Sequence, residues 1–191
     1  LVSVRVPSSV ANMALILERA ISSYHSTFTD HIDPRSSDWL LVRSIFVPFS
    51  ISVVYLFFVK KWGPAYMAKR DAFKIDTLMI LYNIGQIWAS FHLFWKGAHL
   101  WTELNYSFLC QPVDKNDSEL NDQLHSLVYM YYAIKITDLL DTVFFILRKN
   151  FRQVTFLHVY HHVGMVFAGY LGCKFSLNGH FTLLGLINSF V

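Results

Sequence analysis

Charged residues are scarce in this chain, and their scarcity decides its class before any motif is considered. Asp, Glu, Lys and Arg together make up 15% of the 191 residues, whereas a soluble globular domain usually has about 25%. Hydrophobic residues account for 54% of the chain and aromatic residues for 17%. A composition this poor in charge and rich in apolar side chains predicts an integral membrane protein.

Other shortages exclude further classes. Two cysteines, Cys110 and Cys173, are too few for a disulfide framework. The net charge of +3 is weak and no dense basic patch is present, so we expect no nucleic-acid partner. Residues 1–11 lack the basic start and the continuous apolar core of a signal peptide. The chain stops at Val191 within an apolar run, so we expect it to be a carboxy-terminally truncated fragment.

Long apolar stretches predict an all-α fold, a polytopic bundle of transmembrane helices. Four complete stretches each approach the ~20 residues that a bilayer-crossing helix needs, and a fifth stretch has about fourteen. They cover residues 39–59, 77–95, 124–147, 154–173 and about 178–191. Within the preceding segment, residues 13–28 have apolar side chains at helical spacing. This segment predicts a helix on the membrane surface or a short helix packed on the bundle.

The charges between these stretches predict an orientation. Two loops are basic, one containing Lys60, Lys61, Lys69, Arg70 and Lys74 and the other Arg148, Lys149 and Arg152. The charged residues between positions 97 and 123 are mainly acidic. The positive-inside rule therefore places the two basic loops in the cytosol and the amino terminus on the lumenal side. Glycosylation sequons at Asn105 and Asn116 agree with a lumenal position for residues 97–123.

Polar side chains interrupt three of the apolar stretches, where an ionisable group costs several kcal/mol and indicates a functional site. They are Lys135, Asp138, Asp141 and Thr142 in the third stretch, His158, His161 and His162 in the fourth, and Asn83 and Gln86 in the second. At 1.5 Å per residue, most of them lie between about 6 and 14 Å from the cytosolic ends of their helices. We expect them to face a shared interior cavity.

Structural roles are the alternatives for some of these residues. Lys135 and Asp138 can form a buried ion pair that only holds helices together. Asn83 and Gln86 can form interhelical hydrogen bonds without touching a substrate.

Two chemistries use a cluster of three histidines. His158 with His161 or His162 can bind a metal, as in the histidine-box membrane desaturases and hydroxylases, but such sites need several boxes and this chain has one. Alternatively, a neutral imidazole acts as nucleophile or base while carboxylates orient it. Asp138 and Asp141, at the same depth, favour this second chemistry, which requires no metal.

Several motifs resemble those of one family. Residues 153–162, which end in His158-Val-Tyr-His161-His162, resemble the histidine box of the very-long-chain fatty acid elongase (ELO) family, the 3-ketoacyl-CoA synthases of the endoplasmic reticulum. Residues 135–149 resemble a second signature of that family, with Asp138 where Glu is usual. Further similarities lie at residues 63–70, 82–86, 110–113 and 186–191.

The resemblance implies an ELO-type transmembrane domain over residues 39–191, incomplete at its carboxyl end, with about five of an expected seven helices present after a lumenal segment, 1–38. It implies an acyltransferase that condenses long-chain acyl-CoA with malonyl-CoA to 3-ketoacyl-CoA, CO2 and CoA, with malonyl-CoA as co-substrate and no other cofactor. The acyl chain would occupy a closed-ended tunnel in a multi-pass protein of the endoplasmic reticulum membrane. Membrane lipid and other enzymes of the elongation cycle are candidate partners.

Roles follow from this interpretation. The candidate catalytic residues are His158, His161, His162, Asp138, Asp141 and Lys135. His161 would carry the acyl group, and the other two histidines would act as acid, base or oxyanion donors. The aspartates would orient the imidazoles and balance their charge, and the lysine would pair with one aspartate. Candidate substrate-binding residues are Asn83, Gln86, Thr142, Lys60, Lys61, Lys69, Arg70 and Arg148, the basic ones for CoA phosphates.

Two other functions fit the same residues. One is a metal-dependent lipid desaturase or hydroxylase, and the other is an inactive membrane fragment that binds acyl-CoA.

Overall fold

The structure is a computed structural model that describes residues 8–29, 36, 39–113, 118–175 and 179–190. Within these residues the regular secondary structure is entirely helical, which confirms the predicted all-α class. The α-helices are α1 (Ser8–Thr29), α2 (Phe46–Phe57), α3 (Gly63–Ala68), α4 (Asp76–Glu103), α5 (Glu119–Thr137), α6 (Leu139–Leu147), α7 (Phe156–Phe175) and α8 (Phe181–Phe190). A π-helical turn, η2 (Phe58–Trp62), joins α2 to α3, and a short 3-10 helix, η3 (Phe151–Gln153), precedes α7.

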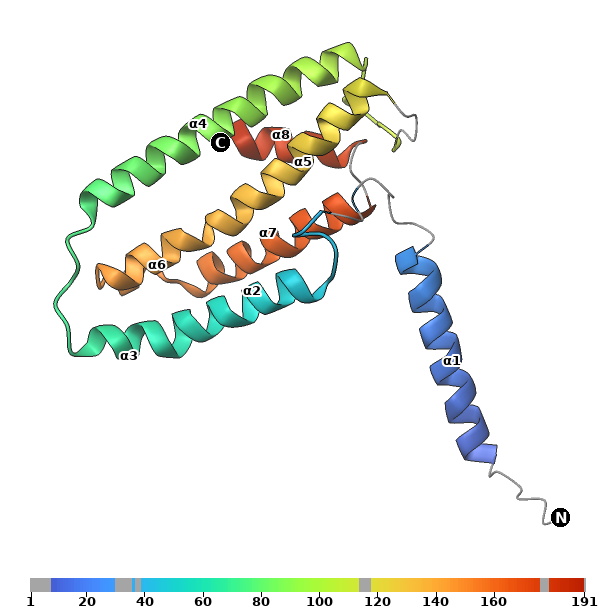
Figure 1. Ribbon diagram of the computed structural model, residues 1–191, viewed down its shortest axis with the longest axis horizontal. Coiled ribbons are helices and arrows are strands. Elements are labelled where there is room, and N and C mark those ends of the chain that lie inside the picture. Colours follow the sequence, from blue (N-terminus) through green and yellow to red (C-terminus); the bar gives the residue numbers. More distant parts are fainter. Residues whose placement is uncertain (1–7, 30–35, 37–38, 114–117, 176–178, 191) are drawn as a thin grey trace.

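The bundle is organised around α5 and its continuation α6. In Figure 1, α4 runs along one side of the bundle, α2 and α3 run along the other, and α5, α6 and α7 lie between them. One apolar core joins α5 to α4 and α8 around Leu100 and Leu124. A second core joins α5, α6, α7 and α2 around Tyr132, Ile146 and Val166. Helices α5 and α6 together therefore connect the two apolar cores of the bundle.

Helix α1 confirms the helix expected over residues 13–28. Its side chains from residue 12 to residue 23 are exposed, and Figure 1 draws the helix apart from the bundle. The described side chains thus show no packing of α1 on the bundle. Two other predictions, the domain boundary at Asp38 and the sequon at Asn116, fall outside the described residues.

The first predicted span, residues 39–59, is displaced along the chain. Its helix begins at Phe46 and continues through η2 and α3 to Ala68. Lys60 and Lys61 therefore lie within a helix, where the sequence predicted a loop. The prediction ended the helix at residue 59 because the apolar stretch is followed there by two lysines.

A widened turn carries the helix through Gly63 and Pro64. Proline has no backbone N–H, and its ring collides with the preceding turn of a regular α-helix. Here the N–H of Gly63 donates to the carbonyl of Phe58, five residues earlier, which is the wider spacing of a π-helical turn. Glycine is required because a Cβ at residue 63 would lie 3.0 Å from Cγ2 of Ile146 on α6. The absent side chain allows α3 to pack closely on α6.

The second and third spans differ from the predicted bounds. Helix α4 begins at Asp76 as expected but continues past residue 95, its predicted end, to Glu103. Helix α5 begins at Glu119, five residues before the predicted start at residue 124. The third span is divided at Asp138, whose backbone accepts from the N–H of Asp141 at 3.2 Å in a tightened turn. The fourth span, α7, begins at Phe156 and agrees with the prediction to within about two residues at each end.

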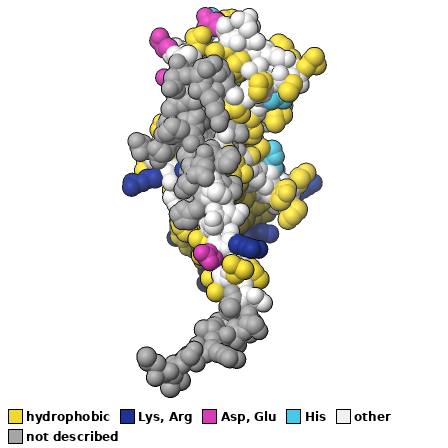
Figure 2. All heavy atoms as spheres, turned by 90° about the vertical axis from the view of Figure 1, so that its right-hand side faces the viewer, with side chains coloured by type: hydrophobic (Ala, Val, Ile, Leu, Met, Phe, Trp, Pro, Cys, Tyr) yellow, Lys and Arg dark blue, Asp and Glu magenta, His cyan; other side chains and the backbone are white. Residues whose placement is uncertain are grey.

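The outer surface of the bundle is apolar. Large hydrophobic side chains such as Phe49, Val54, Ile87 and Trp88 are exposed. Figure 2 shows hydrophobic side chains over much of the described part of one face, with several Lys, Arg, Asp and Glu side chains among them. Soluble monomers rarely expose so much apolar surface. Among the described residues, one continuous helix, Phe46–Ala68, is long and apolar enough to cross a membrane by length and composition.

Candidate functional site

The ends of α4 and α6 are held together at the side of the bundle predicted to face the cytosol. Nη2 of Arg148 lies 3.0 Å from Oδ1 of Asp76, and the backbone N–H of Phe73 donates to the carbonyl of Leu147 at 3.0 Å. The first residue of α4 and the last of α6 are therefore level. Depths counted from these ends are directly comparable, as the sequence argument required.

Asp138 is the centre of the first polar network. Nε2 of Gln86 on α4 donates to its Oδ1 at 2.6 Å, and Nζ of Lys135 donates to its Oδ2 at 3.0 Å. Both carboxylate oxygens therefore have a donor. The predicted pairing of Lys135 with an aspartate is confirmed, and Gln86 and Asp138 lie at one depth as expected. Asp138 reaches across to α4 even though its side chain is one methylene shorter than Glu.

Two tyrosines extend this network. The hydroxyl of Tyr82 accepts from Nε2 of Gln86 at 2.9 Å and donates to the carbonyl of Thr137 at 3.1 Å, and Tyr82 also interacts with Asp141. Nζ of Lys135 lies 5.2 Å above the ring of Tyr131. These tyrosines help to fill the space between α4 and α5, so the acidic groups are surrounded by polar atoms and aromatic rings.

The second network holds His158. Helix α7 begins here because Oγ1 of Thr155 accepts the backbone N–H of His158 at 3.2 Å, as an N-cap does. The imidazole then points to α6, where its Nε2 lies 3.0 Å from Oγ1 of Thr142. The Thr142 hydroxyl also lies 2.7 Å from the hydroxyl of Tyr55 on α2. Three helices therefore meet at one imidazole.

The three histidines differ in exposure. The rings of His158 and His162 are 4.3 Å apart and both side chains are half-buried. His162 also interacts electrostatically with Asp138 and Lys135, which links the two networks. His161 lies 5.9 Å from the ring of His162 and is exposed. His162 is thus the imidazole that interacts with an acid, whereas His158 contacts Thr142. His161, expected to face a shared interior cavity and predicted to carry the acyl group, is exposed.

Other predicted residues lie outside these networks. Asn83 is exposed, three residues from the engaged Gln86. The basic residues Lys60, Lys61, Lys69 and Arg70 are exposed around η2 and α3, and Arg148 is paired with Asp76. Within the described part of the chain, no group of three or more His, Cys, Asp or Glu side chains is arranged to hold a metal ion.

Sequence reasoning missed Tyr55 and the protein contacts of Thr142. Thr142, predicted to bind substrate, is fully buried at 0% exposure and its hydroxyl contacts Tyr55 and His158. Tyr55 is 5% exposed and stands alone as a phenol in an apolar run. Sequence reasoning could have identified Tyr55 from its position inside that run, away from the interfacial ends where tyrosine is common.

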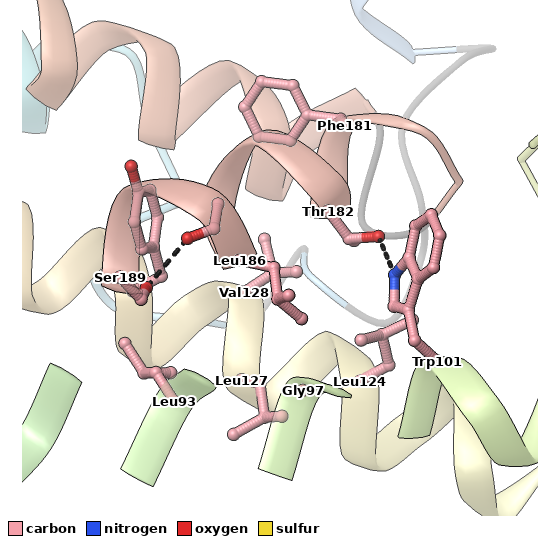
Figure 3. A pocket seen from close by; sticks show the side chains of 12 residues that line it. Leu93, Gly97, Trp101, Leu124, Leu127, Val128, Phe181, Thr182, Leu186 and Ser189 are labelled. Carbon is pink, nitrogen blue, oxygen red and sulfur yellow. Dashed lines mark hydrogen bonds between the residues drawn. The ribbon is translucent and has the colours of Figure 1, made fainter. Parts of the chain in front are cut away.

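A small apolar cavity lies at the opposite end of the bundle, between α4, α5 and α8. Its volume is about 40 Å3, and Figure 3 shows the side chains around it. Nε1 of Trp101 donates to Oγ1 of Thr182 at 2.9 Å beside it. Gly97 and Gly185 contribute no side chain to its lining, and a Cβ at Gly185 would meet nothing within 4 Å.

Residues 40–191 match the model of the ELO family, described as GNS1/SUR4. This chain belongs to the ELO family. It is 38% identical over 180 residues to a very long chain fatty acid elongase of Aedes aegypti, covering 94% of this chain and 50% of that protein. It is 35% identical over 190 residues to very long chain fatty acid elongase 4 of Mus musculus, covering 97% of this chain and 59% of that protein.

The chain spans about half the length of the curated relatives it matches. ELO proteins are polytopic membrane proteins, which accounts for the exposed apolar faces and confirms the predicted class, a membrane helix bundle. All residues of both polar networks lie inside the region that matches the ELO model.

Proposed function

We propose that the protein containing this chain is a condensing enzyme of fatty acid elongation. As an acyltransferase, it joins long-chain acyl-CoA and malonyl-CoA and releases 3-ketoacyl-CoA, CO2 and CoA. The observation that carries the proposal is the ELO match over residues 40–191 together with the position of its histidine box, where His158 and His162 face polar groups of α5 and α6.

The chemistry proceeds in two steps. An imidazole nitrogen attacks the thioester carbonyl of acyl-CoA, the C–S bond breaks, and CoA leaves as a thiol after accepting a proton. Malonyl-CoA then loses CO2, and the resulting enolate carbon attacks the acyl-imidazole carbonyl. The C–N bond breaks, 3-ketoacyl-CoA is formed, and the departing imidazolate takes up a proton from solvent, which replaces the proton that the imidazole gave to the CoA thiolate in the first step. Covalent catalysis of this kind replaces one difficult condensation by two easier steps.

The geometry supports different roles for the three histidines. Nε2 of His158 is already engaged by Thr142, so this imidazole is suited to proton transfer or hydrogen bonding. His161 is exposed and can reach a thioester, and we assign it the acyl-carrying role. The ring of His162 lies 4.3 Å from that of His158 and interacts electrostatically with Asp138 and Lys135, and we assign it the role of donor to the developing oxyanion.

The CoA portions of both substrates are anionic and would bind at the basic end of the bundle. Lys60, Lys61, Lys69 and Arg70 are exposed there and are accessible to phosphates from solvent. The guanidinium of Arg70 lies 4.3 Å above the ring of Tyr66, which limits its rotation. Cations at this basic end of the bundle would bind the phosphates of CoA while the acyl chain extends into the apolar interior.

Release of CO2 tests this function. The complete protein, purified in detergent, is incubated with carboxyl-labelled malonyl-CoA with and without a long-chain acyl-CoA. We expect labelled CO2 and 3-ketoacyl-CoA in the presence of acyl-CoA. Binding of acyl-CoA without CO2 release would instead indicate an inactive acyl-CoA-binding protein, and an oxidised or hydroxylated lipid product would indicate a metal-dependent desaturase or hydroxylase.

The acyl-histidine has a separate test. Incubation with acyl-CoA alone should add one acyl group to His161, which peptide mass spectrometry detects. His161→Ala should lose both the adduct and condensation. His99→Ala is the matched control, because His99 is an exposed histidine beside Glu103 near the other end of α4. Condensation by the His161→Ala variant would remove the nucleophile role from that residue.

We also propose a multi-pass location in the endoplasmic reticulum membrane with a lumenal amino terminus, where other elongation enzymes are candidate partners. Cys110 offers a direct test because it is exposed after α4, whereas Cys173 is buried. In sealed microsomes, a membrane-impermeant maleimide should label Cys110 only after permeabilisation. A cysteine introduced at Lys149, exposed near the opposite end, should react without it. The reverse pattern would invert the orientation.

A further inference from the structure

Helix α1 carries apolar side chains that the rest of the chain does not cover. No described residue of α1 belongs to either apolar core of the bundle. Every side chain from residue 12 to residue 23 is exposed, and several of them are large and apolar, among them Met13, Ile16, Leu17 and Ile21. Exposed apolar side chains at this density indicate an interaction surface.

The apolar and polar side chains of α1 lie on different sides of the helix. At 100° per residue, most of the apolar ones fall within one arc of about 160°. The opposite side carries polar side chains, including Glu18, Arg19 and Ser22, with Leu15 as the apolar exception among them. So wide an arc is typical of a helix lying on an apolar surface, whereas a coiled-coil seam is narrower. The residues of this apolar arc are Met13, Ala14, Ile16, Leu17, Ala20 and Ile21.

The direction of α1 differs from that of the bundle helices. Figure 1 shows α1 beside the end of the bundle where α7 ends, running across the direction of α2, α4 and α7. Because the bundle helices cross the membrane, a helix that runs across their direction lies along the membrane plane. The charges agree, since Glu18 and Arg19 lie at the middle of α1 and a charged side chain at the centre of a bilayer is costly.

The chain after α1 holds the helix close to one face of the membrane. Ser36 is fully buried, and Nζ of Lys174, one residue before the end of α7, donates to the carbonyl of Val42 at 3.4 Å. The segment around residues 36–42 is therefore fixed at the end of α7. From Thr29 to Ser36 the chain can reach at most about 25 Å, at about 3.6 Å per residue. Helix α1 is thus kept near the level of the predicted lumenal face.

We propose that α1 is a membrane-surface helix, with its apolar arc inserted in the lumenal leaflet and its polar side in water. The outer surface of the bundle already contacts lipid, and the leaflet around the lumenal ends of the bundle helices continues under α1. The charges of Glu18 and Arg19 cancel, so the helix suits zwitterionic lipids such as phosphatidylcholine. The assignment to the lumenal leaflet rests on the orientation proposed above, whereas binding to lipid is independent of the condensation reaction.

Nitroxide spin labels measure where each side of α1 lies. The complete protein, with Cys110→Ser to remove the exposed thiol, is labelled at Leu17→Cys or at Glu18→Cys and reconstituted in phosphatidylcholine vesicles. Power saturation compares collisions with O2, which concentrates in lipid, and with a nickel chelate, which stays in water. We expect the O2-to-nickel ratio to be at least about threefold higher at residue 17 than at residue 18. A label at Val54→Cys, exposed on the apolar helix α2, gives the value for lipid.

Two leucines form a matched pair that tests whether the apolar arc binds the lipid. Leu15 and Leu17 are 46% and 61% exposed, but they lie on opposite sides of α1. Leu17→Glu should lower the O2-to-nickel ratio of a label at Ile21→Cys by about threefold, because the new carboxylate has to remain in water. Leu15→Glu adds the same charge on the polar side and should leave the ratio unchanged. Leucine and glutamate have similar helix propensities, so both variants retain the helix.

Two results in vesicles would overturn lipid binding. Equal ratios at residues 17 and 18, both typical of water, would show that α1 does not enter the leaflet. Exclusion of both reagents from residue 17 would show that protein covers the apolar arc. Spin–spin broadening that disappears on dilution with unlabelled protein would identify that protein as a second copy of the chain.

The side of the membrane has its own test. In sealed microsomes, a membrane-impermeant maleimide should modify Glu18→Cys, in the Cys110→Ser background, only after permeabilisation. Modification without permeabilisation would place α1 on the cytosolic leaflet and overturn the lumenal assignment. None of these measurements requires turnover, so a complete protein that released no CO2 from malonyl-CoA would refute the proposed condensation without changing the result for α1.

Discussion

Two ion pairs of equal length in this structure should have unequal effects on stability. Lys135 and Asp138 are separated by 3.0 Å, and so are Arg148 and Asp76. The side chains of the first pair are 17% and 19% exposed, whereas those of the second are 43% and 65% exposed. The two pairs thus have the same N–O distance but differ in burial, so their comparison tests how the surroundings change the contribution of an ion pair to stability.

The magnitudes follow from burial. At 3.0 Å and an effective dielectric constant of about 20, two unit charges attract by about 5.5 kcal/mol, and desolvation cancels much of this. Removing one partner of a buried pair costs about 3–5 kcal/mol. Because Asp138 is also held by Gln86 and is partly exposed, we expect Lys135→Met to lower the free energy of unfolding by about 2–3 kcal/mol. Arg148→Met should cost less than about 1 kcal/mol.

A double-mutant cycle on each pair measures the difference. The single and double variants, with Asp replaced by Asn, are unfolded thermally in detergent, and the coupling free energy is obtained for each pair. We expect a coupling of at least about 2 kcal/mol for Lys135–Asp138 and below about 1 kcal/mol for Arg148–Asp76. Equal couplings would refute the view that the Asp138 network lies in a low-dielectric interior.

Three further predictions concern helix packing, the volume of the apolar cavity and the length of the side chain at residue 138. Gly172→Ala should destabilise the protein by about 2 kcal/mol or more, because the added Cβ would collide with an aromatic ring of α8, whereas Gly85→Ala, which meets nothing within 4 Å, should be neutral or stabilising in thermal unfolding. Gly185→Val should fill part of the apolar cavity and shorten the longest acyl product, measured by chromatography of products formed in microsomes. Asp138→Glu should lower stability by about 1 kcal/mol, since the 2.6 Å bond to Gln86 leaves no room for a methylene, and Gln86→Asn in the same protein should restore it.

The transmembrane helices, and the depths of their residues in the membrane, could be predicted from sequence because the membrane imposes simple constraints. A helix of known rise per residue converts a residue number into a depth once one end is located, and the basic loops locate the ends. This reasoning placed Gln86 level with Asp138 and brought His158 to the region of Thr142, and the structure joins both pairs by hydrogen bonds. The prediction needed no knowledge of side-chain rotamers.

Helix ends and interruptions were harder to predict, since they depend on tertiary contacts. The first apolar stretch was predicted to end at residue 59, but a π-helical turn carries the helix past Pro64 and Gly63 allows α3 to pack against Ile146. Lys174 directly follows the fourth predicted stretch, yet it is buried and its Nζ lies 3.4 Å from the carbonyl of Val42. Both outcomes depend on a segment distant in sequence, which local pattern cannot report.

Most residues of the candidate site were predicted, but the contacts that each of them makes were not. Periodicity places residues on a helix face to within about 20–40°, which is too coarse to decide whether Thr142 contacts substrate or protein. The same limit applies to His161, whose predicted sector is shared with the half-buried His162 although its own ring is exposed. Tyr55 escaped notice because a single phenol in an apolar helix has no partner in the linear pattern.

The spacing of the two anchors on the central rod explains how the site can act as a unit. Asp138 and Thr142 are four residues apart, so they lie about one helical turn and about 6 Å from each other on one side of α5–α6. Asp138 is held by α4 and Thr142 by α2 and α7. A displacement of α6 along its axis relative to α2, α4 and α7 would therefore strain both networks, because Asp138 lies at the tightened turn that begins α6 and Thr142 lies one turn further along it. The short helix α6 thus connects the acid network to the histidine network.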